Sequence, residues 1–132
     1  MSIEDQKQHA RQFLTALDKG DEAMLAELIG ADFRFELMTS APGFPAALDR
    51  DGFLTNLPKV LKELLPHGMN FTFGVAVSEG PYVSMEGTSE TQTSTGRPYT
   101  NRYHWYFRFA DGKIVEFKEY MVAWQMMQAF AP

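Results

Sequence analysis

The sequence predicts an α+β domain with helices on one face of a curved antiparallel sheet. Apolar residues recur at helical spacing in the N-terminal half, whereas from residue 71 onward they alternate with the period of two that is typical of strands. Aromatic residues make up 14% of the chain, which favours a rich core with an apolar cavity in it. A chain of 132 residues can bury such a core, so we expect a single domain over residues 1–132.

The first helix is predicted to begin near Ile3. Ser2 and Asp5 resemble a capping box, in which each side chain accepts a hydrogen bond from a backbone N–H at the helix start. Apolar residues follow on one helical face. Gly20 suits the left-handed conformation that ends many helices.

A second helix is expected over about 22–29, capped by Asp21 and stopped by Gly30. Apolar residues then alternate over 33–38, which predicts a half-buried strand. The stretch 40–52 carries two prolines and two glycines and is expected to be a loop. Loops of this length in compact domains are more often functional lids than plain links.

A third helix follows this loop. Its apolar stripe consists of Phe53, Leu54, Leu57, Val60, Leu61, Leu64 and Leu65. Pro58 lies inside the pattern, so the helix either begins near Asn56 or kinks at the proline. Four strands are then expected as an antiparallel meander. They span about 71–77, 82–93, 99–109 and 113–122.

Composition and charge argue against several classes of partner. Seventeen acidic against twelve basic residues give a net charge of −5, which disfavours nucleic acid and anionic membrane surfaces. The chain has no cysteine, and no two of its three histidines have metal-ligand spacing, so we expect no metal site. No apolar run reaches the ~20 residues of a membrane span, and the N-terminal residues do not resemble a signal peptide. We therefore expect a cytoplasmic protein.

The last hairpin determines which side chains face the core. Its turn, at 110–112, admits two registers, and a three-residue loop separates apolar from charged side chains better than a two-residue turn does. The favoured register pairs Phe107 with Val115, Trp105 with Phe117, and Tyr103 with Glu119.

Glu119 is then a carboxylate on an otherwise apolar and aromatic face. Because burial disfavours the charged form, we expect its pKa to lie above the ~4.3 of a free glutamate. Tyr103 across the strand and Asn101 beyond it are the expected hydrogen-bond donors. These three residues are the candidate catalytic group, with Glu119 as the base. A buried carboxylate that serves only architecture is the alternative interpretation.

Glu86 and Glu90 admit two orientations. The apolar residues at the start of their strand take the other parity, which turns both glutamates to solvent. A bulge at Gly87 would reverse the parity midway and turn Glu86 toward Glu119.

Two parts of the chain resemble a known family. The chain resembles the start of the nuclear transport factor 2-like superfamily in Ala16-Leu17-Asp18-Lys19-Gly20-Asp21 and in Ala31-Asp32-Phe33. It is similar to the SnoaL-like polyketide cyclase branch in Gly96-Arg97-Pro98-Tyr99, Asn101-Arg102-Tyr103-His104, Asp111-Gly112-Lys113-Ile114 and Glu119-Tyr120-Met121. The resemblance covers nearly the whole chain. It implies a cone-shaped fold, the cystatin-like roll, in which a curved antiparallel sheet wraps over N-terminal helices around an apolar pocket.

The resemblance also implies a small apolar molecule as ligand, no cofactor, and a homodimer formed through the back of the sheet. Members of the superfamily include ketosteroid isomerases, epoxide hydrolases, dehydratases and aldol cyclases, and also proteins that only bind. The outer face of the last hairpin has a mixed composition that suits an interface. It carries Arg102, His104, Tyr106, Arg108, Ile114, Glu116, Lys118 and Tyr120.

Some family positions match and others depart. Glu119 resembles the acidic general base that the cyclases and limonene epoxide hydrolases carry on the last strand. Trp105 stands where the polyketide cyclases have a catalytic histidine. Glu86 and Thr88 stand at the arginine and aspartate positions of the epoxide hydrolases, which argues against epoxide hydrolysis. Val122 replaces an aspartate that is frequent in the branch.

The sequence therefore predicts a cofactor-free acid–base enzyme, of isomerase, aldol cyclase or dehydratase type, that acts on a small apolar carbonyl compound. Glu119 takes a proton next to the carbonyl group, and Tyr103 with Asn101 stabilises the enolate oxygen. The expected ligand-binding residues are Phe35, Leu37, Glu86, Trp105 and Phe117. Two alternatives stand beside it: a non-catalytic module that binds small ligands, and a structural or protein-interaction dimer.

Overall fold

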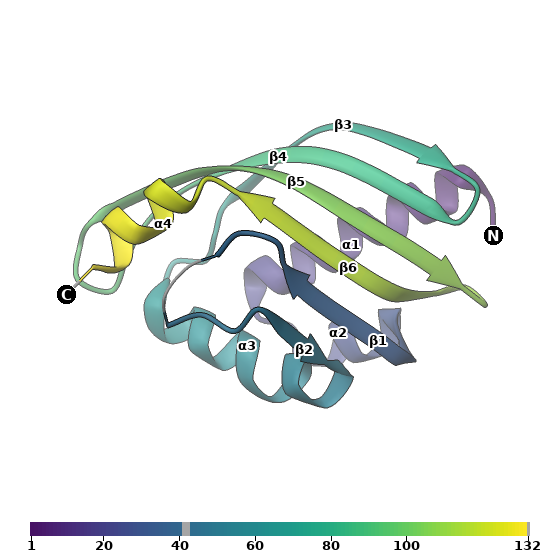
Figure 1. Cartoon of the computed structure of the whole chain (residues 1–132), viewed down its shortest axis with the longest axis horizontal. Coiled ribbons are helices and arrows are strands. Elements are labelled where there is room, and N and C mark those ends of the chain that lie inside the picture. The colour runs from purple at the N-terminus through teal and green to yellow at the C-terminus, as the bar shows by residue number, and fades with distance from the viewer. Residues whose placement is uncertain (41–42, 132) are drawn as a thin grey trace.

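The computed structural model describes residues 1–40 and 43–131, and it confirms the α+β class. Its elements, in chain order, are α1 (Ile3–Lys19), α2 (Glu22–Leu28), β1 (Ile29–Leu37), β2 (Ala47–Asp49), α3 (Arg50–Leu64), β3 (Phe71–Glu79), β4 (Tyr82–Gln92), β5 (Pro98–Ala110), β6 (Lys113–Met121) and α4 (Ala123–Phe130). The strands form one six-stranded sheet in the order β2-β1-β6-β5-β4-β3 (Figure 1). The four strands from β3 to β6 are the predicted meander.

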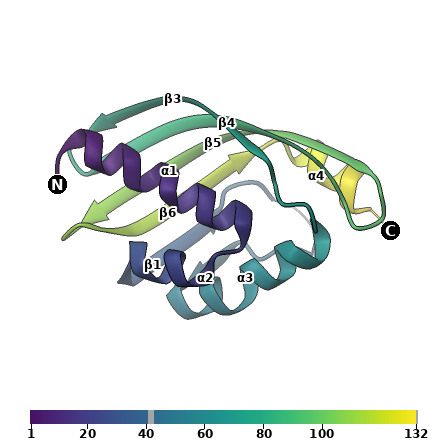
Figure 2. The same ribbon diagram turned by 180° about the vertical axis from the view of Figure 1, so that it is seen from behind.

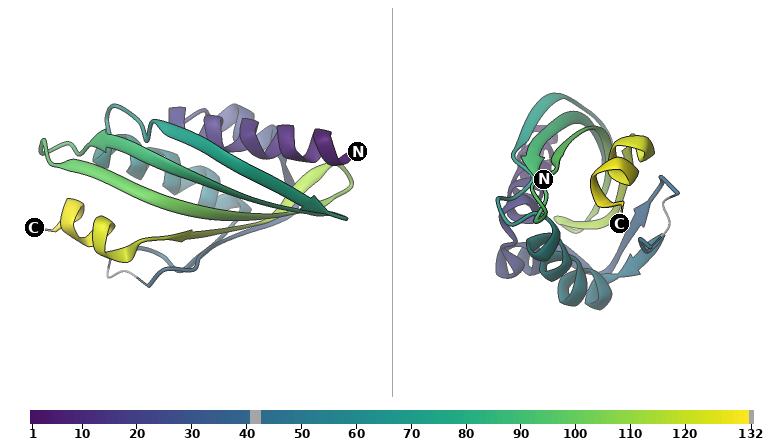
Figure 3. Two further views of the ribbon diagram at one scale, coloured as in Figure 1. Left: turned by 90° about the horizontal axis from the view of Figure 1, so that it is seen from above. Right: turned by 90° about the vertical axis from the view of Figure 1, so that its left-hand side faces the viewer.

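The sheet curls around its interior, and the N-terminal helices cover one side of it. Seen from behind, α1 lies in front of the sheet, with α2 and α3 beside it (Figure 2). The end-on view shows a sheet curved like an incomplete barrel, with α4 near its open end (Figure 3). α1 packs against β3, α3 against β1, and α4 against β5. A curved sheet over N-terminal helices is the architecture that the resemblance implies.

One strand pairing differs from the predicted antiparallel sheet. β1 runs parallel to β6, with Phe35 beside Phe117 and Leu37 beside Glu119. The other four pairings among the described residues are antiparallel. A parallel pair needs a long crossover, and the chain from β2 through β5 supplies it. The parallel pairing brings side chains of β1 next to Glu119.

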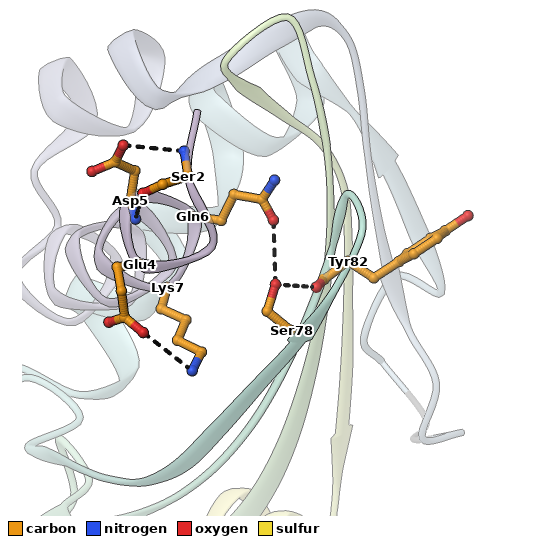
Figure 4. Close-up of polar contacts among 7 residues, drawn as sticks. All are labelled: Ser2, Glu4, Asp5, Gln6, Lys7, Ser78 and Tyr82. Atoms are coloured by element: carbon orange, nitrogen blue, oxygen red, sulfur yellow. Dashed lines mark hydrogen bonds and ion pairs between the residues drawn. The ribbon is translucent and has the colours of Figure 1, made fainter.

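The start of α1 has the predicted capping box (Figure 4). Asp5 N donates to Ser2 Oγ at 3.0 Å, and Ser2 N donates to Asp5 Oδ2 at 3.2 Å. One turn further on, Gln6 faces the β3–β4 hairpin, where its Oε1 lies 3.4 Å from the Ser78 hydroxyl (Figure 4). The same hydroxyl lies 2.9 Å from the Tyr82 carbonyl oxygen. The N-terminus of the helix is therefore attached to the sheet.

Two predicted boundaries shift. β1 begins at Ile29 directly after α2, so Gly30 lies within the strand rather than at a helix end. The predicted loop at 40–52 contains β2 and the start of α3, which Asp49 caps. Residues 41–42 of the predicted lid lie outside the described residues.

α3 begins well before its proline. Pro58 lies inside the helix and is buried, so the alternative of a start near Asn56 is wrong. Phe53 and Leu54 of the predicted stripe are buried, whereas Val60 is 41% exposed. Within residues 1–40 and 43–131, no helix is long and apolar enough to cross a membrane.

Aromatic rings dominate the core, as the composition predicts. The ring of Phe13 in α1 lies 5.7 Å from that of Phe53 in α3, and 5.6 Å and 4.8 Å from those of Phe107 and Phe117 in the sheet. None of these four side chains is exposed to solvent. A second, smaller cluster lies beside this core. It consists of Leu65, Met69, Tyr99, Met126 and Ala129.

Candidate functional site

The β5–β6 hairpin combines a two-residue turn with a β-bulge, and the predicted register is wrong by two residues. Asp111 and Gly112 both have positive φ, 51° and 76°, which a tight hairpin turn requires. The register then shifts between Arg108 and Phe109. The resulting pairs are Phe107 with Phe117, Trp105 with Glu119, and Tyr103 with Met121. A shift of two residues keeps every side chain on its predicted face, so Glu119 still points into the core.

The bulge also changes the place of Ile114. The sequence assigns Ile114 to the outer face, but it pairs with Phe109 and is completely buried. It therefore belongs to the core and not to an interface.

Glu119 is a buried carboxylate whose hydrogen bond comes from Trp105. Its side chain is 7% exposed, and Trp105 Nε1 donates to its Oε2 at 2.9 Å. Burial raises the pKa of Glu119 to about 7, although the hydrogen bond from Trp105 lowers it. The direction agrees with the sequence prediction, but the donor is Trp105 rather than Tyr103. Among the described residues, Oε1 of Glu119 has no hydrogen-bond partner.

Gly87 makes room for the indole of Trp105. A Cβ atom at Gly87 would lie 2.5 Å from Cζ3 of Trp105, closer than any side chain tolerates. The indole also stacks on Tyr103, with ring centroids 5.0 Å apart and planes 10° from parallel. The indole that holds Glu119 is thus fixed in orientation by its neighbours.

A small cavity lies in front of Glu119. Its volume is about 60 Å³. Its lining residues are Leu17, Phe35, Leu37, Phe44, Pro45, Leu57, Leu61, Leu64, Leu65, Met69, Tyr99, Phe117, Glu119, Met121, Met126 and Phe130. Glu119 is the one charged side chain in this lining, as far as the structure describes the chain. The cavity is therefore an apolar space with a carboxyl group in its wall.

The predicted ligand-binding residues fall into three groups. Phe35, Leu37 and Phe117 line the cavity. Trp105 is completely buried and is not part of the cavity lining, but it donates a hydrogen bond to Glu119, which is. Glu86 is exposed and pairs across the strand with His104 on the outer face, so its assignment to the pocket is wrong.

The parity of β4 explains the position of Glu86. Gly87 is not bulged; the irregularity lies in the neighbouring strand, between Phe73 and Ala76. Glu86 and Thr88 therefore both face outward. Neither position of the epoxide hydrolase pattern lies at the cavity.

Tyr103 and Asn101 both contact the hydroxyl of Tyr99 rather than Glu119. Asn101 Nδ2 donates to the hydroxyl of Tyr99 at 2.9 Å, and Tyr103 Oη lies 3.3 Å from the same atom. Tyr103 Oη also lies 2.9 Å from the hydroxyl of Ser89. Tyr99, which the sequence analysis did not select, lines the cavity. Its parity on β5, shared with Asn101 and Tyr103, was the signal that could have identified it.

Aromatic side chains close the outer end of the cavity. The ring of Phe130 in α4 lies 5.3 Å from that of Tyr99 and 5.9 Å from that of Phe44. Arg97 holds the end of α4, since its Nη1 donates to the carbonyl oxygens of Gln128 at 3.3 Å and Ala131 at 2.7 Å. Phe44 and Phe130 are partly exposed, so they form the solvent side of the cavity.

The outer face of the sheet carries a connected group of charged side chains. Arg108 Nε and Lys118 Nζ lie 3.2 Å and 3.3 Å from oxygens of Glu116. Lys118 Nζ also lies 5.2 Å from the centre of the Tyr106 ring. Across residues 1–40 and 43–131, no cluster of three or more His, Asp or Glu side chains has the geometry to hold a metal ion.

The comparisons with known proteins agree with this fold. An NTF2-like protein of unknown function from Burkholderia pseudomallei is 17% identical, with a TM-score of 0.85 over 100% of both chains. A proposed isomerase from Bacillus subtilis is 21% identical, with a TM-score of 0.86 over 98% of this chain and 96% of that one. IdmH, a proposed polyketide cyclase from Streptomyces antibioticus, is 24% identical, with a TM-score of 0.77 over 96% of this chain and 99% of that one.

The sequence comparisons assign the family. No curated protein matches the chain. The family model of the SnoaL-like domain matches residues 10–117, which is most of the chain. The matched region ends just before Glu119. The resemblance found in the sequence is thereby confirmed: the chain belongs to the SnoaL-like domain family of the NTF2-like superfamily.

Proposed function

We propose that the protein is an acid–base enzyme that acts on a small, neutral, largely apolar carbonyl compound, with Glu119 as the general base. The observation that carries the proposal is a carboxyl group with a pKa of about 7 in the wall of an apolar cavity. A base with such a pKa is partly ionised at neutral pH and still strong enough to accept a proton from a weak acid.

The proposed step is proton transfer from carbon. Glu119 accepts the proton next to the carbonyl group, the electrons of the C–H bond move toward the carbonyl oxygen, and an enolate forms. Protonation at another carbon gives isomerisation, attack on a second carbonyl gives aldol cyclisation, and loss of a β-hydroxyl group gives dehydration. The step itself uses only the carboxylate, so the proposed reaction needs no cofactor.

The lining of the cavity supports a neutral ligand. Apart from Glu119, the described lining residues are apolar or aromatic, and none is Lys, Arg or His. An anionic ligand would lose its hydration and meet a carboxylate without a counter-charge. The volume of about 60 Å³ is smaller than the ~150 Å³ that accommodates benzene in an apolar cavity, so a ring-sized ligand must displace side chains such as Phe44 or Phe130.

Deuterium exchange tests the base without knowledge of the natural substrate. Cyclopentanone and larger cyclic ketones are incubated with the protein in D₂O, and the loss of α-protons is followed by NMR. We expect the protein to accelerate the exchange and Glu119→Gln to reduce the acceleration by roughly a hundredfold or more. The rate should rise with pH up to about 7, as Glu119 becomes ionised.

Glu86→Gln is the matched control, because it makes the same chemical change on the exposed face of β4. It should leave the exchange rate unchanged. Equal rates in Glu119→Gln and the unmodified protein refute the proposed base. Ketone binding without any acceleration favours the alternative function, a non-catalytic module for small ligands.

We also propose a homodimer through the outer face of β5 and β6. The mixture of aromatic and charged side chains there supports it. Glu116 already pairs with Arg108 and Lys118 of its own chain, so a pairing of Glu116 with the partner subunit across a two-fold axis would have to share these charges.

A further inference from the structure

Four polar side chains form a connected group at the end of the cavity. Tyr99, Asn101 and Tyr103 project from β5, and Ser89 projects from β4. All four are buried. Of this group, Tyr99 alone also lines the cavity. Tyr99 is therefore the member through which the group reaches a bound molecule.

The hydrogen bonds favour one direction for the proton of Tyr99. The amide of Asn101 can only donate to Tyr99 Oη, at 2.9 Å. The pairs Ser89–Tyr103 and Tyr103–Tyr99, at 2.9 Å and 3.3 Å, each allow either direction. If Ser89 donates to Tyr103 and Tyr103 donates to Tyr99, the hydroxyl protons of Ser89 and Tyr103 both have an acceptor. Tyr99 Oη then accepts two hydrogen bonds and keeps its own proton for a third partner.

That third partner is a weak one in the structure. The proton of Tyr99 points to the Sδ atom of Met121, 3.9 Å away, in the wall of the cavity. A thioether is a poor acceptor, so a carbonyl oxygen that entered the cavity would replace it readily. Burial raises the pKa of Tyr99 above its usual value, so the hydroxyl stays protonated and remains a donor.

We propose that the Tyr99 hydroxyl donates a hydrogen bond to the oxygen atom of the ligand, and that Ser89, Tyr103 and Asn101 position it. The proposal rests on the proposed function, in which the ligand carries a carbonyl group. It replaces the assignment of Tyr103 and Asn101 as direct donors to the enolate oxygen, because both lie behind Tyr99. A donor that strengthens as negative charge develops on the oxygen stabilises the enolate more than the ketone.

The cavity then contains two polar groups with opposite roles. The carboxylate of Glu119 accepts a proton, and the hydroxyl of Tyr99 donates one in a hydrogen bond. The donations of Tyr103 and Asn101 polarise the Tyr99 hydroxyl and make it a stronger donor. Such a pair selects neutral molecules that carry an oxygen acceptor close to an acidic C–H bond, and it rejects plain hydrocarbons of the same shape.

The test is the infrared carbonyl band of bound ¹³C-labelled cyclopentanone, measured in the unmodified protein and in Tyr99→Phe. The measurement is made at about pH 9, two units above the pKa of about 7 for Glu119, where the carboxylate can only accept hydrogen bonds. We expect the bound carbonyl band at lower wavenumber in the unmodified protein than in Tyr99→Phe. Tyr99→Phe should also weaken cyclopentanone binding roughly two- to tenfold, the range of one neutral hydrogen bond.

Three other variants separate the explanations. Tyr82→Phe makes the same change at an exposed tyrosine on the outer face and should leave band and affinity unchanged. Tyr103→Phe should move the band in the same direction as Tyr99→Phe but less far, since it removes a positioning residue. Glu119→Gln should retain the low band while losing deuterium exchange, so that a failure of the proposed base does not disturb this readout.

Identical bands in the unmodified protein and in Tyr99→Phe would overturn the inference. A larger effect of Tyr103→Phe than of Tyr99→Phe would also overturn it, because the donor would then be Tyr103. The absence of saturable cyclopentanone binding in the unmodified protein counts against it as well.

Discussion

Replacing Glu119 with glutamine should change the pH dependence of stability. In the folded protein the pKa of Glu119 is about 7, compared with 4.5 for an unperturbed glutamate. Between these two values the folded state holds a proton that the unfolded state has lost. The free energy of unfolding therefore falls as pH rises from about 4.5 to about 7, and the contribution of Glu119 is fully lost above that range.

The pKa difference sets the magnitude. A difference between 4.5 and about 7, at 1.36 kcal/mol per unit, corresponds to about 3 kcal/mol. Glutamine does not ionise, and its side-chain oxygen can still accept the hydrogen bond from Trp105. We therefore expect Glu119→Gln to match the unmodified protein near pH 4 and to exceed its stability by about 3 kcal/mol near pH 8.

Urea denaturation at a series of pH values measures this difference. The other carboxylates titrate in both proteins, so the difference between the two free energies of unfolding isolates Glu119. Glu86→Gln, an exposed glutamate changed in the same way, should show no such rise. A difference between Glu119→Gln and the unmodified protein that stays constant from pH 4 to pH 8 would refute the elevated pKa.

The neighbours of Glu119 and the outer face offer three more tests. Trp105→Phe removes the hydrogen bond that lowers the pKa of Glu119, so ¹³C NMR titration of the carboxyl group should give a value above about 7; an unchanged value contradicts the contact. Gly87→Ala places a methyl group 2.5 Å from the Trp105 ring and should lower the free energy of unfolding in urea by roughly 1–3 kcal/mol, whereas a neutral effect would contradict the close fit. Tyr106→Glu adds a charge to the proposed dimer interface and should convert dimer to monomer in light scattering. If the unmodified protein is already monomeric at micromolar concentration, the homodimer is wrong.

The features that local chemistry determines could be predicted from the sequence. The Ser2–Asp5 capping box and the left-handed Gly20 depend only on nearby backbone groups, and both are present. The inward direction of Glu119 was also predictable, although the pairing was not. Strand parity survives a register error of two residues, so the wrong partner did not change the face.

The features that tertiary packing determines could not be predicted in this way. The bulge in β3 reverses its parity, so that Val75 and Val77 of an apparently apolar face are 70% and 58% exposed. A bulge adds one residue to one strand, and although Gly74 lies at this one, Gly87 in β4 carries the same signal without a bulge, so a strand glycine does not locate it. Trp105 was expected as a ligand contact because nothing in the sequence says that Gly87 leaves space for its ring. Only the packing of Trp105 against Gly87 shows that Trp105 is the residue that donates a hydrogen bond to Glu119.

A comparison between glutamate and glutamine at position 119 bears on the choice between architecture and chemistry. Small domains are stable by roughly 5–15 kcal/mol, so about 3 kcal/mol lost at neutral pH is a substantial part of the total. A residue that served only to satisfy the indole N–H of Trp105 would do so better as glutamine, which accepts the same hydrogen bond without a buried charge. The property that glutamate has and glutamine lacks is the ability to gain and lose a proton near neutral pH. That ability is what the proposed proton transfer requires, and the cavity in front of Glu119 is where the proposed ligand would bind.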